Sequence, residues 1–170
     1  MFTKVDIEKY FVAEKQESLL FMIIGAVAII IALAGIFVWK TQCWKGASIP
    51  LLVIALIQIV AGYTVYARSD KQRVDVVYAF DMNPDKLKNE ELPRIQTVNR
   101  NFIIYRWVEI VLFITAVVFA FLYKGNTNKQ FWFGLAFALA LQAAIMLAAD
   151  YFAERRALNY TKGIESVVKK

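Results

Sequence analysis

The sequence contains no histidine and a single cysteine, Cys43. Without histidine, ordinary haem ligation, histidine-dependent phosphatase chemistry and histidine-based metal sites are excluded. One cysteine excludes an internal disulfide, a redox pair and a cysteine-rich metal site. The phosphate-binding patterns G-x-x-x-x-G-K-S/T and G-x-G-x-x-G are missing too, as is a serine in a nucleophile elbow. The sequence therefore predicts no metal and no cofactor, and it argues against an enzyme.

Charged residues are absent from three long segments, 18–39, 46–67 and 130–149, in a chain that is 59% apolar. A helix needs about 20 apolar residues to cross a bilayer core ~30 Å thick, so each segment is long enough to span it. A fourth segment carries Arg106 and Glu109 near its start and is uncharged from 110 to 123. The sequence predicts four membrane spans, at about 18–39, 47–67, 102–123 and 130–152.

The connections between the spans decide the fold class. Short segments at 40–45 and 124–129 join the first and the second pair of spans, and short connections make neighbouring helices antiparallel. The expected fold is therefore all-α, an integral membrane four-helix bundle of two antiparallel transmembrane hairpins. Residues 1–170 form a single four-span transmembrane domain with cytoplasmic helical extensions, and the cytoplasmic loop 68–100 is its largest polar segment.

Apolar spacing inside the 68–100 loop predicts helical extensions of the spans. Val74 and Tyr78 fall on one helical face, which favours a second helix that continues beyond the membrane. Asn83-Pro84 and Pro93 predict two breaks. From Ile95 onward the helical spacing runs without interruption into the third span, and the fourth helix is expected to protrude as well, through residue 158.

Two helix starts are also readable. Thr3, followed three residues later by Asp6, predicts a capped helix near the N-terminus. This segment is either a short amphipathic helix on the inner membrane surface or the leading turns of the first membrane helix. Ser48 followed by Pro50 predicts the start of the second membrane helix.

The distribution of basic residues predicts the orientation. Of the 20 Lys and Arg residues, Arg106 lies within a predicted span and the two short connections hold Lys40, Lys45, Lys124 and Lys129. All the others lie before the first span, in the 68–100 loop or after the fourth span. Because basic residues favour the cytoplasmic side, both termini are expected to be cytoplasmic. We place the chain in the inner bacterial (plasma) membrane.

Small residues recur along two of the predicted spans. In lipid, small residues let helix backbones approach closely, and packing drives helix association. Such a stripe is either an intramolecular packing face or the interface of a homo-oligomer, and the spacing is compatible with both. The predicted helix-packing residues are Gly25, Ala28, Ala32 and Gly35 in the first span and Ala136, Ala140, Ala144 and Ala148 in the fourth.

Several polar residues lie within the predicted spans, where each charge costs about 2.5–3.5 kcal/mol on insertion scales. Arg106, Glu109 and Asp150 are expected at similar depth in the cytoplasmic half, so Arg106 is expected to pair with Glu109, Asp150 or both. The deeper members of the predicted buried polar cluster are Gln58 and Gln142, with Tyr63 between the two levels. This cluster is either a structural clamp or a polar cavity for a lipid headgroup, an ion or a proton. A third option is that Arg106 extends to lipid phosphates.

Three functions are compatible with these features. The first is a non-enzymatic accessory or structural subunit, or a small homo-oligomer, whose cytoplasmic extensions contact a partner. The second is a small channel or transporter lined by Glu109, Arg106, Asp150 and Gln58. The third is a lipid-modifying membrane enzyme with Asp150 or Glu109 as general base. The expected partners are membrane lipids and a homo-oligomer or larger membrane complex. Acids alternate with the basic residues of the inner rim, so no nucleic acid is expected.

The orientation gives a direct prediction. A peptide tag at either terminus should be protected from protease added to intact cells, because both ends are expected inside. Protection is measured by immunoblot before and after cell lysis, and cleavage of either tag in intact cells would overturn the orientation.

Overall fold

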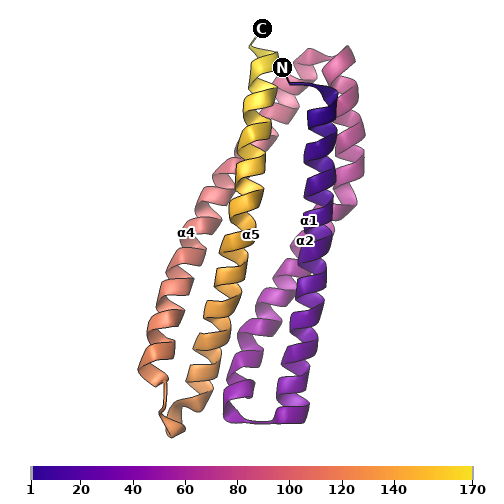
Figure 1. Ribbon diagram of the computed structural model, residues 1–170. Helices are drawn as coiled ribbons and strands as arrows, with labels where there is room; N and C mark the ends of the chain where they lie inside the picture. Colours follow the sequence, from indigo (N-terminus) through magenta and orange to yellow (C-terminus); the bar gives the residue numbers. More distant parts are fainter. Residues whose placement is uncertain (1, 170) are drawn as a thin grey trace.

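The computed structural model describes residues 2–169, and within this range the chain is helical, without strands. Four long helices run along a common direction (Figure 1). Short helical turns connect or extend them. The elements in chain order are α1 (Lys4–Ala34), the π-turn η1 (Gly35–Trp39), α2 (Gln42–Met82), α3 (Pro84–Lys86), the π-turn η2 (Leu87–Glu91), α4 (Leu92–Tyr123), the 3-10 turn η3 (Thr127–Lys129) and α5 (Gln130–Val168).

The first helix begins where the sequence predicts. The Asp6 carboxylate accepts hydrogen bonds from the Thr3 backbone N–H, at 2.9 Å, and from the Thr3 hydroxyl, at 2.8 Å. This capping box satisfies backbone groups that the first turn leaves without helical partners. α1 then runs to Ala34 without interruption. The N-terminal segment therefore forms the leading turns of the first long helix and is not a separate surface helix.

The predicted start of the second helix at Ser48 and Pro50 is wrong. α2 begins at Gln42, and the Thr41 hydroxyl caps it by accepting the Trp44 N–H at 3.3 Å. Pro50 lies inside α2 and is buried. The Ser48 hydroxyl donates to the Trp44 carbonyl at 2.7 Å and to the Ala32 carbonyl of α1 at 2.9 Å. Ser48 thus joins the two helices of the first hairpin, and the loop between them shortens to residues 40–41.

Of the two breaks predicted in the 68–100 segment, one is confirmed and one is wrong. α2 ends at Met82, where the Asn83 side chain accepts the Lys86 N–H at 3.2 Å and Pro84 opens the next helix. Pro93, by contrast, lies in the first turn of α4, directly after η2. A proline has no N–H to donate to the preceding turn, and here the preceding turn is the π-turn η2 rather than a regular α-helical turn. Helical structure therefore continues from Pro84 to Tyr123.

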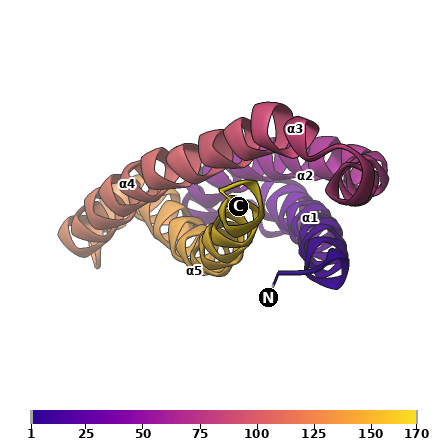
Figure 2. The ribbon, with the colours of Figure 1, turned by 90° about the horizontal axis from the view of Figure 1, so that it is seen from above.

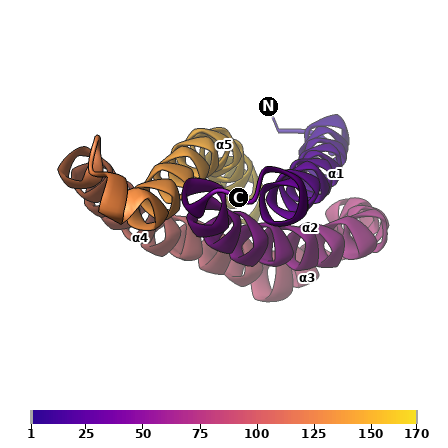
Figure 3. The ribbon, with the colours of Figure 1, turned by 90° about the horizontal axis from the view of Figure 1, so that it is seen from below.

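All four long helices are apolar and long enough to cross a membrane, by length and composition. α1 packs against α2 and α4 against α5, which gives the two expected antiparallel hairpins. The hairpins meet through α2 and α5. Seen from below, α4, α5, α2 and α1 follow one another in a bent row (Figure 3). The outer helices α1 and α4 therefore each have one main neighbour in this part of the molecule.

Glycines bring α2 and α5 into backbone contact near their first turns. A Cβ atom placed on Gly134 would lie 1.9 Å from the Cys43 carbonyl oxygen, and one placed on Gly46 would lie 1.9 Å from the Phe131 carbonyl oxygen. Both distances are far below van der Waals contact, so these positions require glycine while the helices keep this separation.

The two small-residue stripes have different environments. All of Gly25, Ala28, Ala32 and Gly35 are buried. Their side of α1 faces α2: a Cβ on Gly25 would meet Ala55 and Ile59, and one on Gly35 would meet Ser48 and Trp44. Intramolecular packing therefore accounts for the first stripe.

The stripe on α5 is only partly covered within the chain. Ala136 is buried and Ala140 is half-buried, whereas Ala144 and Ala148 are exposed. The last two alanines are therefore not covered within the chain, and both alternatives, intramolecular packing and a homo-oligomer interface, stay open for this stripe.

At the other end, the four helices share one core. We call this part the polar head and define it as residues 4–17, 68–101 and 153–168. Figure 2 shows this end from above, where α5 and α1 lie side by side, opposite α3 and the first turns of α4. The core of the head contains large side chains from every long helix. Its buried residues are Ile7, Tyr10, Phe11, Val76, Ala79, Leu87, Ile95, Ala157, Tyr160 and Ile164.

The contact between α2 and α5 gives a second prediction. Gly134→Ala should lower the midpoint of thermal unfolding in detergent, because the added methyl forces the helices apart; overpacking costs typically ~1–3 kcal/mol. Ala144→Val adds bulk to an exposed position of the same helix and serves as the control. Equal midpoints for the two variants would contradict the close approach of α2 and α5.

Candidate functional site

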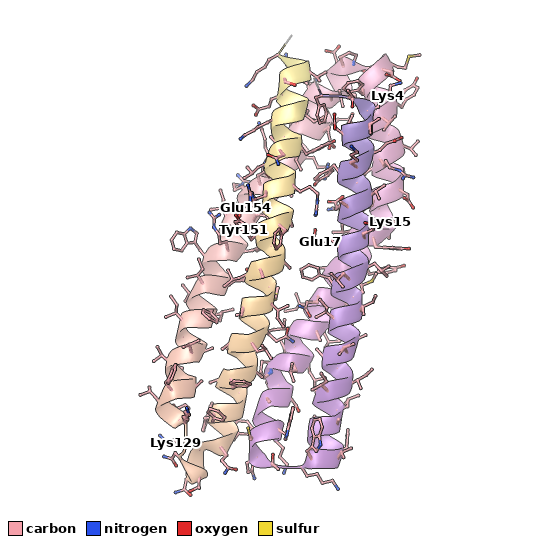
Figure 4. The ribbon with its side chains drawn as sticks, in the orientation of Figure 1. Lys4, Lys15, Glu17, Lys129, Tyr151 and Glu154 are labelled. Atoms are coloured by element: carbon pink, nitrogen blue, oxygen red, sulfur yellow. The ribbon has the colours of Figure 1, made fainter. Side chains whose placement is uncertain are left out.

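Matched polar pairs line the contact between α4 and α5. The Asn99 amide donates to the Thr161 hydroxyl at 2.7 Å. Seven residues further along α4, Arg106 Nη1 donates to both carboxylate oxygens of Glu154, at 2.9 Å each. Glu154 lies seven residues before Thr161, so the pairs keep the register of two antiparallel helices. Figure 4 shows Glu154 and Tyr151 on neighbouring turns of α5.

The predicted partners of Arg106 are wrong. Its carboxylate partner is Glu154, and not Glu109 or Asp150. The antiparallel register explains the difference, because Arg106 faces the α5 turn that follows Asp150. The Glu154 side chain is 11% exposed and the Arg106 side chain 43% exposed. Solvent or lipid therefore reaches the Arg106 side chain of the pair much more than the Glu154 side chain.

Glu109 and Asp150 occupy the next level of the same interface. Their carboxyl groups interact directly across the α4–α5 contact. Glu109 is buried, as predicted, and its Oε2 atom has no hydrogen-bond partner among residues 2–169. The Glu109 carboxyl group is therefore only partly satisfied by hydrogen bonds within the described residues.

The deeper members of the cluster differ in exposure. Gln58 and Gln142 are buried, at 2% exposure each. Both amide atoms of Gln58 and the amide oxygen of Gln142 have no partner in the described chain. Tyr63 is 65% exposed, so its predicted place in the buried cluster is wrong. Gly62, its neighbour on α2, takes the inward position against Ser18 and Met22 of α1.

A second polar cluster, which the sequence analysis missed, lies in the core of the polar head. Glu91 is buried and accepts two hydrogen bonds from Arg94, both at 2.7 Å. The Tyr160 hydroxyl of α5 donates to the same carboxylate, also at 2.7 Å. The Arg94 guanidinium lies 5.6 Å from the ring centre of Phe11 on α1. The cluster thus ties η2 and α4 to both α5 and α1.

Burial and charge fix the protonation of this cluster. Burial raises the pKa of the Tyr160 phenol, and the Glu91 carboxylate raises it further. Burial alone would lower the pKa of Arg94, but the hydrogen bonds and charge of Glu91 outweigh it, and the pKa rises. Tyr160 therefore stays a neutral donor and Arg94 a cation. Burial also raises the pKa of Tyr10, which stacks on Tyr160 with ring centres 4.0 Å apart.

Ion pairs hold α1 to its neighbours around this core. Arg156 of α5 pairs with Glu17 of α1, and Figure 4 shows Glu17 beside the space between these helices. Lys15 of α1 pairs with Asp70 of α2. Glu14 lies between these pairs, and its Oε2 atom is buried without a hydrogen-bond partner among residues 2–169. α1 therefore carries into the head one buried carboxylate oxygen that no hydrogen bond satisfies within the described residues, although Arg94, Arg68 and Arg156 lie near enough to attract its charge.

Two hollows lie in the polar head. The larger, of about 600 Å³, lies between α1 and α5 and is lined by residues that include Lys9 and Arg155. The smaller, of about 150 Å³, lies between the end of α2 and η2, beside Glu91 and Arg94. A volume of 300–1,000 Å³ is typical of small-molecule sites, so the α1–α5 groove is the larger candidate.

Comparison with known proteins does not extend this picture. No family model, curated protein or solved structure matches the chain. Among residues 2–169, no three acidic or cysteine side chains gather in a way that would hold a metal ion. The function therefore has to be argued from the geometry of the head and of the α4–α5 contact.

The Arg106–Glu154 pair gives a third prediction. Arg106→Leu should lower the unfolding midpoint in detergent, because removing one partner leaves the Glu154 carboxylate buried and unpaired, at a cost of about 1–3 kcal/mol. In the Arg106→Leu background, Glu154→Leu should restore part of the loss. Glu109→Leu is the matched control and should not restore it. Rescue by Glu109→Leu alone would contradict the pairing with Glu154.

Glu14 gives a fourth prediction, on pH dependence. Burial raises the pKa of Glu14 above its ordinary value of 4.5. The folded chain therefore holds the Glu14 proton more tightly than the unfolded chain does. The contribution of this group to the free energy of unfolding is fully present below pH 4.5 and is lost as the pH rises through the raised pKa. Glu14→Gln should be more stable than the natural chain at neutral pH and no more stable below pH 4.5.

The measurement is thermal unfolding in detergent across this pH range. Glu8→Gln, at an exposed position of α1, is the control and should follow the natural chain at every pH. A constant difference between Glu14→Gln and the natural chain would show that Glu14 does not titrate as described.

Proposed function

We propose that this chain is a non-enzymatic integral membrane protein that acts as an accessory or structural subunit, or as a small homo-oligomer. In this proposal the four long helices cross the inner membrane, both termini and the polar head lie in the cytoplasm, and the head binds a protein partner. No catalytic step is part of the proposal.

Exposed apolar side chains along the helices support the membrane placement. Val111, Ile114, Phe121 and Leu122 of α4 are all more than half exposed. In water, the hydrophobic effect would favour covering such a surface with other protein groups. In lipid this driving force is missing, because the lipid chains are as apolar as the side chains. Exposure in this part of the molecule therefore needs no protein partner.

The single observation that carries the binding role is an apolar stripe on the polar head. Val74, Tyr78 and Met82 lie four residues apart on one face of α2 and are 62%, 63% and 70% exposed. Charged residues surround them, including Asp75 and Asp81, so this face of α2 contacts water rather than lipid. A contiguous apolar face on a water-exposed helix is typical of a protein interface.

The alternatives have weaker support. Arg106, the one cation of the predicted pore lining, is neutralised by Glu154. The two hollows described above lie at the polar head. A channel or a lipid-modifying enzyme would use Glu109 or Asp150 at an open surface, and Glu109 is 6% exposed. The geometry therefore favours binding over transport or catalysis.

The stripe gives a fifth prediction. The double variant Val74→Ser and Tyr78→Ser should fold and insert normally, because changes at exposed positions usually alter stability by less than about 0.5 kcal/mol. It should nevertheless lose its partner. In mild detergent, the complex extracted from native membranes should shrink to the size of the single chain in its micelle, measured by size-exclusion chromatography with light scattering.

Leu158→Ser changes an exposed apolar residue of the head on α5 and is the matched control. This variant should keep the size of the native complex. The mass of that complex separates a homo-oligomer from an assembly with other chains. A natural chain that is already monomeric in native membranes, or a double variant of unchanged size, would refute the proposed role of the stripe.

A further inference from the structure

The groove between α1 and α5 has a defined roof and floor. At its upper end, the Phe2 ring lies over the Gly163 backbone, where a Cβ would be 2.2 Å from the ring. Phe2 also meets Tyr160 edge to face, at 5.9 Å between ring centres. The stacked rings of Tyr10 and Tyr160 line the groove as well. Aromatic packing therefore shapes the groove, and two of its lining residues, Tyr10 and Tyr160, belong to the buried core of the head.

Cations dominate the polar surface of the groove. Lys9, Arg155 and Arg156 line it from the two helices, and Asp6 is its one acidic residue. Asp6 is already engaged, since its carboxylate accepts two hydrogen bonds from Thr3. The groove therefore offers a net positive charge to a ligand.

The three cations differ in how far they are already satisfied. Within residues 2–169, Lys9 and Arg155 take part in no ion pair with an acidic side chain. Arg155 donates one hydrogen bond to the Tyr151 hydroxyl, at 3.3 Å. Arg156 is held by Glu17, but its Nε–H is buried and has no acceptor in the described chain. Donors to an anionic group thus remain free on both sides of the groove.

The lower end of the groove lies at the expected membrane boundary. Ala13 and Phe152 line this end, and Phe152 is the last residue of the fourth predicted span. The small Ala13 side chain leaves the groove open on the α1 side, where a larger residue would fill it. A ligand in the groove would therefore have its charged part beside Lys9 and Arg155 and its other end directed toward the bilayer.

We propose that the α1–α5 groove binds the phosphate headgroup of an anionic phospholipid from the cytoplasmic leaflet. Lys9 and Arg155 contact the phosphate from opposite helices, Arg156 adds its positive charge nearby, and the acyl chains leave past Ala13 and Phe152. Basic residues near the cytoplasmic surface attract anionic lipids generally. The groove adds a shaped site of about 600 Å³ to that attraction. This inference rests on the membrane placement proposed above, but not on the partner of the α2 stripe.

The test compares thermal unfolding of the purified full chain in a neutral detergent with added phosphatidylglycerol or phosphatidylcholine. Phosphatidylglycerol should raise the unfolding midpoint of the natural chain by on the order of 5 °C more than phosphatidylcholine. The double variant Lys9→Gln and Arg155→Gln should lose this difference, and so should Ala13→Phe, which fills the groove without changing its charge.

The matched control is Lys88→Gln with Arg100→Gln, which removes the same charges from exposed positions of the head outside the groove. This control should keep the full response. If the control loses the phosphatidylglycerol response as much as the groove variants do, the response comes from the overall positive charge of the head, and the proposal is wrong. The proposal is also wrong if phosphatidylglycerol does not stabilise the natural chain more than phosphatidylcholine. Glycerol 3-phosphate tests whether the groove binds a soluble phosphate ester instead of a lipid headgroup. If it stabilises the natural chain as strongly as phosphatidylglycerol, the site takes a free phosphate ester and the lipid assignment is wrong.

These outcomes are separable from those of the proposed function. A groove variant that loses the lipid response should still form the native complex, because Lys9 and Arg155 lie away from Val74 and Tyr78. If the purified chain instead stays monodisperse without any detergent or lipid, the proposed membrane placement itself is wrong.

Discussion

The arrangement of this protein depends on the side chain of Tyr160. Its ring stacks on Tyr10 of α1 and meets Phe11 edge to face, with ring centres 4.0 and 5.9 Å apart. Its hydroxyl donates to Glu91, which also holds Arg94. One residue of the last helix therefore fixes the first helix and the start of the third long helix. Buried aromatic rings of this kind contribute both a large apolar area and a specific geometry.

In the proposed membrane placement, the two ends of the molecule lie in different solvents, water and lipid. In water, burying apolar area drives association, and the head core accordingly contains large side chains such as Phe11, Leu87 and Ile164. In lipid, that driving force is missing and close packing takes its place. The apolar half accordingly relies on alanines such as Ala32 and Ala55 and on the glycine contacts of α2 with α5. The change from small to large core residues marks the expected membrane boundary.

Much of the fold was readable from the sequence because it depends on local patterns. Long uncharged segments predict long apolar helices, and the Thr3 cap and the Asn83-Pro84 break follow from short-range hydrogen bonding. The prolines were harder to interpret, because a proline often marks the start of a helix. Pro50 instead lies inside α2, and Pro93 follows η2 in a helical segment that begins earlier.

The candidate site was less predictable, because partners across an interface depend on helix register. Arg106 pairs with a carboxylate of α5, but one helical turn separates Asp150 from the partner in the structure, Glu154. The Glu91–Arg94–Tyr160 cluster was missed altogether. A signal for it existed in the i,i+3 spacing of Glu91 and Arg94 just after a break, which is the spacing of an ion pair on one helix. Nothing local in the sequence pointed to Tyr160, which lies 69 residues away from Glu91.

The head core also sets an order of events during synthesis. Ile7 and Phe11 are translated well before their core neighbours Tyr160 and Ile164, which belong to the last long helix, α5. The first helix therefore has no completed core to pack against until the final turns of α5 are made. Until then, the side chains of Ile7 and Phe11 lack the partners that bury them in the folded chain.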